Sequence, residues 1–255
     1  MSISNDHWEV NMEFSDTRYN RQMVMPQIGE QGQQKISSGS VVSVGAGGVK
    51  SPLLYYLAAA GVGKIKIIDF DRVELSNLNR QILYTTNDIG RYKAEVAAEK
   101  LRMLNPDITI EFSTERVTNE NIDSMLGNFD VLLEGGDGPD QRLMVNQFAV
   151  DNQCPMVHVS AQYAYGYVFT MINKEDPCLN CAFPDLPASR KGPVPVWGPA
   201  TGIAGVMGAN EVLKILLGKG ELARGYLMSC SNFQNDYYRL PIPKDPHCPS
   251  CGAGK

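Results

Sequence analysis

Several features that mark specialised protein classes are absent from this 255-residue sequence. No apolar run approaches the roughly 18 residues that cross a membrane, so no membrane span or membrane partner is predicted. Basic residues are in the minority, with 23 Lys and Arg against 28 Asp and Glu, which argues against a nucleic-acid partner. Residues 1–16 are polar and acidic, so no secretory signal is predicted and we expect a cytoplasmic protein. A hydrophobic content of 43% excludes disorder as the main state.

Cysteine is also scarce, and its placement argues against a disulfide framework. Two of the six cysteines, Cys154 and Cys230, stand alone in strand-like segments, where a buried inert thiol is expected. The other four form two CxxC pairs: Cys178, Cys181, Cys248 and Cys251. This spacing is typical of a tetrahedral Zn²⁺ site, and four thiolates leave no open position, so we predict a structural zinc. A pair of redox motifs is the alternative.

The periodicity of apolar residues predicts an α/β fold. Strands are expected at 40–45, 64–69, 108–112, 131–134 and 156–160, with helices at 51–60 and 91–105. Strands that alternate with helices predict a Rossmann-like, doubly wound and mostly parallel sheet. Antiparallel strands at 165–172 and within 225–240, with a helix near 202–217, form a C-terminal extension.

We expect one domain over 1–255. It divides into an N-terminal helical arm (about 1–38), a nucleotide-binding core (about 39–160), and a substrate and zinc extension (about 161–255).

A glycine-rich turn joins the first expected strand to its helix. Gly45, Gly47 and Gly48 would let the backbone approach phosphates at the start of the helix, and Asp69 ends the next strand, where a carboxylate can bind a ribose. Lys50 occupies the place of the third glycine in the dinucleotide pattern, which weakens an NAD interpretation and places a cation near the phosphates. A glycine-rich turn without a ligand is the alternative.

Five motifs, in order, carry a resemblance to a known family. They are the segment RYNRQ at 18–22, GAGG at 45–48, DFDRVELSNLNRQ at 69–81, GRYK at 90–93 and the two CxxC pairs. Together they cover nearly the whole chain, which resembles the ThiF/MoeB/HesA group of ubiquitin-activating-enzyme-like adenylyltransferases.

The resemblance implies an ATP-dependent enzyme that activates a carboxylate as its acyl-AMP and releases pyrophosphate. It implies that Asp69 holds the ribose, that Asp137 organises Mg²⁺ and the α-phosphate, and that Arg21 reaches the γ-phosphate from the partner subunit of a homodimer. The residues that it places around the triphosphate are Asn77, Arg80, Gln81 and Lys93. No general base is needed, because a carboxylate is already ionised at neutral pH.

The sequence departs from the family in ways that bear on the substrate. Gly138 stands where an asparagine is usual, and the proline-rich crossover loop at 182–200 has no cysteine. We therefore expect the reaction to stop at the adenylate, which a downstream thiol acceptor protein can take over. A methanogen member that adenylylates guanylylpyridinol for the iron-hydrogenase cofactor is similar in lacking that cysteine.

A small-molecule carboxylate of this kind is accordingly favoured. Arg190, Lys191 and Trp197 would clamp it, unless Trp197 is a hinge anchor and the cations are solvated. The alternatives are the C-terminal glycine of a ubiquitin-like sulfur carrier, an NAD-dependent oxidoreductase, and a nucleotide-binding scaffold without turnover.

Overall fold

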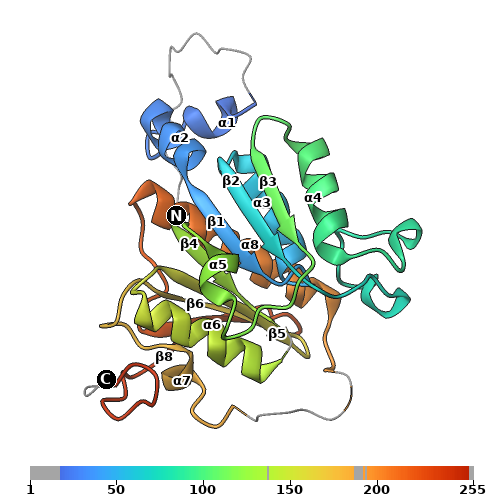
Figure 1. Cartoon of the computed structure of the whole chain (residues 1–255). Coiled ribbons are helices and arrows are strands. Elements are labelled where there is room, and N and C mark those ends of the chain that lie inside the picture. Colours follow the sequence, from blue (N-terminus) through green and yellow to red (C-terminus); the bar gives the residue numbers. More distant parts are fainter. Residues whose placement is uncertain (1–17, 137, 187–191, 193, 253–255) are drawn as a thin grey trace.

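A computed structural model describes residues 18–136, 138–186, 192 and 194–252. Within these residues one sheet of eight strands runs in the order β3-β2-β1-β4-β5-β6-β7-β8 (Figure 1). The strands are β1 (Ser40–Val44), β2 (Lys64–Ile68), β3 (Thr109–Ser113), β4 (Val131–Glu134), β5 (Met156–Gln162), β6 (Tyr165–Met171), β7 (Tyr226–Ser231) and β8 (Asp236–Pro241). Across the sheet, the neighbouring strands from β3 through β2, β1 and β4 to β5 pair in parallel, and those from β5 to β8 pair antiparallel. The mostly parallel sheet with an antiparallel extension is confirmed.

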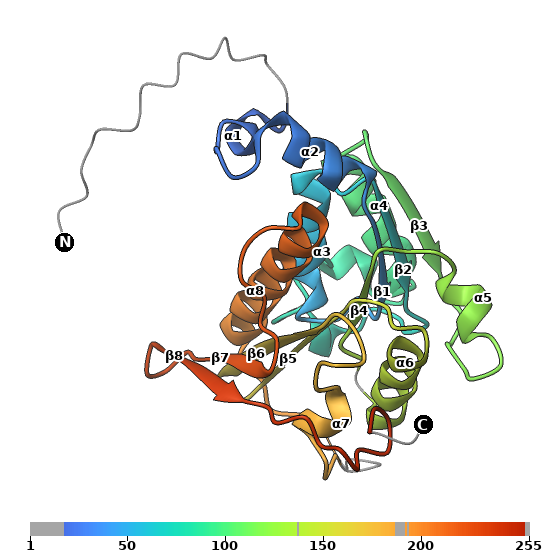
Figure 2. The same cartoon turned by 90° about the vertical axis from the view of Figure 1, so that its left-hand side faces the viewer.

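Helices cover both faces of the parallel half of this sheet (Figure 2). The helices of the described residues are α1 (Asn20–Met23), α2 (Gly29–Ser38), α3 (Lys50–Ala60), α4 (Lys93–Leu104), α5 (Ile122–Leu126), α6 (Pro139–Asp151), α7 (Leu179–Ala182) and α8 (Gly198–Leu217), with 3₁₀ turns at Leu75–Asn77 and Thr86–Asp88. Helices α3, α4 and α8 lie on one face, and α5 and α6 lie on the other.

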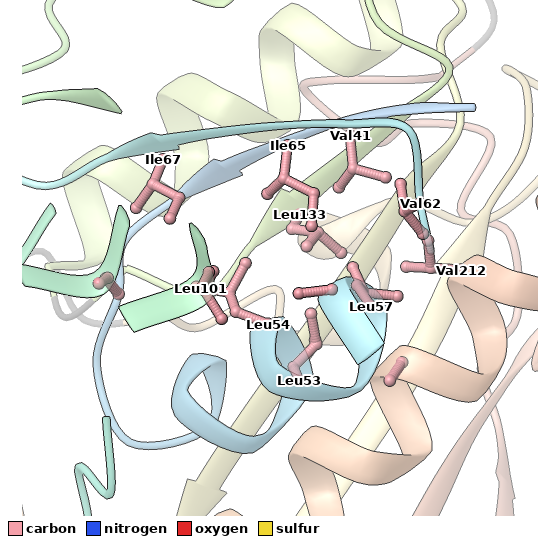
Figure 3. Packing of buried hydrophobic residues seen from close by; sticks show 14 of the residues in the cluster. Val41, Leu53, Leu54, Leu57, Val62, Ile65, Ile67, Leu101, Leu133 and Val212 are labelled. Atoms are coloured by element: carbon pink, nitrogen blue, oxygen red, sulfur yellow. The ribbon is translucent and has the colours of Figure 1, made fainter. Parts of the chain in front are cut away.

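Alternating side chains of the central strands feed two separate cores. Val131 and Leu133 of β4 belong to the core beneath α3, α4 and α8, whereas Leu132 between them belongs to the core beneath α5 and α6. This period of two places apolar residues on both faces, which is why the parallel strands read as continuous apolar runs. Figure 3 shows Leu53 and Leu54 of α3 packed in the first core.

Helix α8 starts four residues earlier than the periodicity indicated, at Gly198, with Pro199 in its first turn. It is the one helix in the described part of the chain that is long and apolar enough, by length and composition, to span a membrane. Half of that stretch is buried inside the fold, where it packs on α3, β5 and β6. Glycines make this packing close, because a Cβ at Gly205 would lie 2.3 Å from the carbonyl oxygen of Val49.

Candidate active site

A cavity of about 770 Å³ opens at the carboxyl ends of β1, β2, β4 and β5. After β1 the chain builds β2 and β3 on one side of it and then returns to build β4 and β5 on the other side, so the strand order reverses at β1. Open α/β sheets bind ligands at such a switch point. The cavity gathers seven of the residues predicted from sequence: Gly45, Gly47, Gly48, Asp69, Arg80, Gln81 and Lys93.

The glycine turn and Asp69 are tied together by backbone donors. Gly45 has a φ of +95°, a conformation that glycine adopts without steric cost, and the chain then enters α3. The N–H of Ala46 donates to one carboxylate oxygen of Asp69 at 2.8 Å, and the N–H of Asp71 donates to the other at 2.9 Å. Burial raises the pKa of Asp69, while these donors and the Lys93 charge oppose that rise. Asp69 thus fixes the turn at the end of β2 and faces the cavity.

Cationic and amide side chains line the cavity beside the glycine turn and Asp69. Lys93, the first residue of α4, is buried and lies 3.1 Å from a carboxylate oxygen of Asp71. Arg80 donates to the carbonyl oxygen of Ser76 at 2.8 Å, which leaves its guanidinium beside the cavity. The side-chain oxygen of the buried Gln81 has no hydrogen-bond partner among the described residues. This set suits a polyanionic ligand with polar groups.

Two predicted site residues, Asn77 and Arg21, lie away from the lining of the cavity, and a third is not described. Asn77 is buried and lies outside the described lining of the cavity, and its side-chain oxygen accepts the N–H of Glu74 at 3.2 Å. Arg21 lies on α1, whose neighbour Gln22 donates to the carbonyl oxygen of Ala60 at the far end of α3 from the glycine turn. Asp137 lies outside the described residues.

The structure adds lining residues that sequence reasoning missed. The guanidinium of Arg116 stacks 3.8 Å from the ring centroid of Phe70, and both side chains line the cavity beside Asp69. Arg142 lies on α6 and donates to the carbonyl oxygen of Gly136 in the turn after β4. Arg142 could have been predicted, because it lies near the start of the helix that follows a glycine-rich turn. Nothing local in the sequence distinguishes Arg116.

The Lys50 ammonium does not face the cavity, where the sequence placed a cation near the expected phosphates. Lys50 is fully buried, it lies outside the described lining, and its ammonium donates to the carbonyl oxygen of Glu134 at 2.8 Å. The backbone of Lys50 belongs to the first turn of α3. Its side chain runs beneath Gly135, one of the glycines that line the cavity. Burial lowers the pKa of Lys50 to about 7, against the opposing charge of Glu134.

The crossover segment forms one edge of the cavity. Val194 and Val196 line it, and the segment is pinned to the turn between β5 and β6. The N–H of Tyr163 donates to the carbonyl oxygen of Pro195 at 2.7 Å, and the N–H of Trp197 donates to that of Tyr163 at the same distance. Trp197 is half-exposed and lies 5.9 Å from Phe233 between ring centroids, as an anchor of the segment would.

The clamp expected from the sequence also includes Arg190 and Lys191. Arg190 and Lys191 lie outside the described residues.

A sequence model of the ThiF family matches residues 19–250. The chain belongs to the ThiF family. It is 39% identical over 246 residues to a sulfur carrier protein adenylyltransferase of Thermus thermophilus, a match that covers 92% of this chain and 90% of the relative. It is 36% identical to the SAMP-activating enzyme E1 of Haloferax volcanii (93% and 89% covered) and 31% identical to the heterocyst protein HesA of Trichormus variabilis (92% and 88% covered).

A longer relative and a solved structure were also found to be similar. An adenylyltransferase and sulfurtransferase MOCS3 of Culex quinquefasciatus is 35% identical, and the chain spans 55% of its length. The crystal structure of Escherichia coli MccB with ATP has a TM-score of 0.84 at 22% identity, covering 95% of this chain and 75% of that one, which shows the same fold. As a ThiF-family member the chain is an ATP-dependent carboxylate adenylyltransferase, as the resemblance implied.

The two CxxC pairs of this ThiF-family chain meet in space. The four sulfur atoms all lie within 4.8 Å of one another, with Sγ–Sγ distances of 3.6 Å for Cys178 and Cys248 and 3.5 Å for Cys181 and Cys251. Four thiolates about 2.3 Å from a tetrahedral Zn²⁺ would lie about 3.8 Å apart, so the cluster fits that ion. It joins the segment at α7 to the end of the described chain, and none of its members lines the cavity.

The two single cysteines also lie outside the described lining of the cavity. Burial raises the pKa of Cys154 to about 11, so its thiol is protonated at neutral pH. Cys230 is buried in β7, and its thiol donates to the carbonyl oxygen of Gly166 at 3.5 Å. Neither thiol therefore lies where it can attack a ligand in the cavity.

Proposed function

We propose that this chain activates the C-terminal carboxylate of a ubiquitin-like sulfur-carrier protein as its acyl-adenylate. The observation that carries the proposal is the match to the Thermus thermophilus sulfur carrier protein adenylyltransferase over nine-tenths of both chains. The match to the Haloferax volcanii SAMP-activating enzyme, again over nearly the full length of both, supports it. This substrate takes the place of the small molecule that the crossover loop suggested.

The residues around the cavity divide the work of adenylation. The backbone of the glycine turn and the N-terminus of α3 face the phosphates, and Asp69 binds the ribose. Arg80 and Lys93 neutralise charge that develops on the departing pyrophosphate. Mg²⁺, held through Asp137, would add further neutralisation. The attacking carboxylate needs no base, so the protein's task is to align it with the α-phosphorus.

The geometry of the cavity mouth suits an extended peptide end. Val194 and Val196 form an apolar edge, and Ser160 and Ala161 of β5 lie on the lining with them. Exposed aromatic side chains follow on the neighbouring surface, among them Tyr163 and Trp197. A protein carrier would therefore meet exposed aromatic side chains on the turn between β5 and β6 and on the crossover segment.

A small carboxylate such as guanylylpyridinol is the second candidate, and the observation in its favour is the lack of a nearby thiol. No cysteine occurs in the crossover loop or among the described lining residues. An enzyme without its own nucleophile releases or hands on the adenylate, so a downstream acceptor takes the acyl group with either substrate.

The position of α1 argues for a homodimer in which Arg21 acts in trans. The eleven residues of α3 separate the glycine turn from the contact of α1 with Ala60. A helix of that length spans roughly 16 Å, too far for an arginine to reach the phosphates of its own subunit. A second subunit can present Arg21 at the cavity instead.

ATP–pyrophosphate exchange tests the substrate. The chain is assayed with a purified sulfur carrier, with the same carrier lacking its final glycine, and with a panel of small carboxylates. We expect exchange with the intact carrier alone, and an AMP adduct on it in mass spectra. Exchange with a small carboxylate, and none with intact carriers, would replace the proposed substrate by the second candidate.

A further inference from the structure

A buried polar cluster lies directly under the floor of the cavity and has no part in the chemistry described so far. It contains Lys50 of α3, Glu134 at the end of β4 and His158 of β5, each at most 1% exposed. Arg142 of α6 flanks it. Burying charges is costly, so a cluster of this kind needs compensating contacts in the fold.

Each member of the cluster comes from a different element beside the cavity. The Lys50 ammonium donates to the carbonyl oxygen of Glu134, and the Glu134 carboxylate accepts the N–H of Gly136 at 3.0 Å. The other carboxylate oxygen pairs with Nδ1 of His158, which precedes the lining residues Val159 and Ser160. The cluster thus connects the helix behind the glycine turn, the turn after β4, and the end of β5.

The contact between Lys50 and the turn after β4 is close. A Cβ at Gly135 would lie 3.0 Å from Cε of Lys50 and 2.8 Å from the carbonyl oxygen of Val159. The lysine stem therefore fills the space under Gly135, and only glycine fits above it. Burial lowers the pKa of His158, so the ring is neutral and its Nδ1–H donates to Glu134.

We propose that Lys50 is a positioning residue: a buried strut that holds the glycine turn and the turn after β4 at a set separation. Both turns line the cavity on which the proposed adenylation depends, so their separation sets how the α-phosphate meets the carboxylate. Lys50 touches no ligand itself. It acts through Glu134 and Gly135, in a position where the third glycine of the dinucleotide pattern would leave the two turns unconnected.

The test compares Lys50→Met, which keeps the length of the stem but cannot donate, with Lys35→Met as a matched control. Lys35 makes the same kind of bond, from its ammonium to the carbonyl oxygen of Leu217 at 3.1 Å, away from the cavity. The double variant Lys50→Met/Glu134→Gln removes the strut together with the buried negative charge that the Lys50 ammonium offsets, in case the single variant fails to fold. Each variant is assayed as folded protein by pyrophosphate exchange and by hydrogen–deuterium exchange.

We expect kcat to fall by about 10²-fold in both Lys50 variants while KM for ATP changes little, because misplacement of about 1 Å costs that much in rate. Amide exchange at residues 134–136 should accelerate in both, and Lys35→Met should match the wild type in every readout. Unchanged kcat, or unchanged amide exchange at 134–136, would overturn the proposal.

The amide-exchange readout needs no turnover. If the wild type itself shows no pyrophosphate exchange, the proposed function fails while the strut is still judged by the amides.

Discussion

Replacing Lys50 should remove a dependence of stability on pH that the wild type shows above neutrality. The buried ammonium has a pKa of about 7, against an ordinary value of 10.5. Burial is the main cause, and Arg142 adds to it, while the Glu134 carboxylate opposes both. Above pH 7 the folded protein releases this proton, but the unfolded chain keeps it, so rising pH favours the folded state.

The size of this effect follows from the two pKa values. The full lowering of the Lys50 pKa, from 10.5 to about 7, corresponds to roughly 5 kcal/mol in the free energy of unfolding, since one pKa unit is worth about 1.4 kcal/mol. Between pH 7 and pH 9 the free energy of unfolding should rise by about 2 kcal/mol from Lys50 alone, because the group is half titrated at the start of that interval. The gain in the free energy of unfolding is complete above the pKa of the unfolded chain, and it is lost as the pH falls through about 7.

Urea unfolding at pH 7, 8 and 9, with excess zinc and constant ionic strength, measures this effect as a difference. Cysteines and tyrosines titrate in the same range, so the quantity compared is the wild-type free energy of unfolding minus that of Lys50→Met. The difference should grow by about 2 kcal/mol, whereas Lys35→Met should follow the wild type. If the wild type and Lys50→Met change in parallel, the buried ammonium does not titrate as argued.

Three further predictions concern the metal, the dimer and the thiols. Chelation of the metal at the four clustered cysteines should lower Tm more than it lowers ATP affinity, and a metal-free protein with unchanged Tm would contradict a structural zinc. Arg21→Ala and Asp137→Ala chains, each inactive, should recover exchange activity when mixed; no recovery despite demonstrated subunit exchange would place Arg21 in cis. Cys154→Ala/Cys230→Ala should retain exchange activity, whereas Asp137→Ala should lose about 10²-fold, and a thioester trapped on either cysteine would refute this.

Local patterns in the sequence were sufficient for much of the fold and of the site. The alternation of apolar strands and helices predicted the parallel sheet, because side-chain periodicity reflects the faces that a segment buries. Glycines between a strand and a helix, followed by Asp69 at the end of the next strand, predicted one wall of the cavity. Both signals lie within about 25 residues, where backbone geometry determines which atoms meet.

Contacts between distant segments required the tertiary structure. Cys178 and Cys248 are 70 residues apart, and their spacing predicted a metal site without showing where it lies in the fold. Arg116 faces the cavity only because β3 ends beside β2, where its guanidinium meets Phe70.

Lys50 shows most clearly what the local sequence pattern does not determine. Its place in the glycine motif suggested a cation beside phosphates, but the side chain of a residue in the first turn of α3 follows whatever space the packing leaves. That space lies under Gly135, where Glu134 supplies both an acceptor and a counter-charge. The sequence determined which residue stands at the turn, and the packing of three distant elements decided where its charge lies.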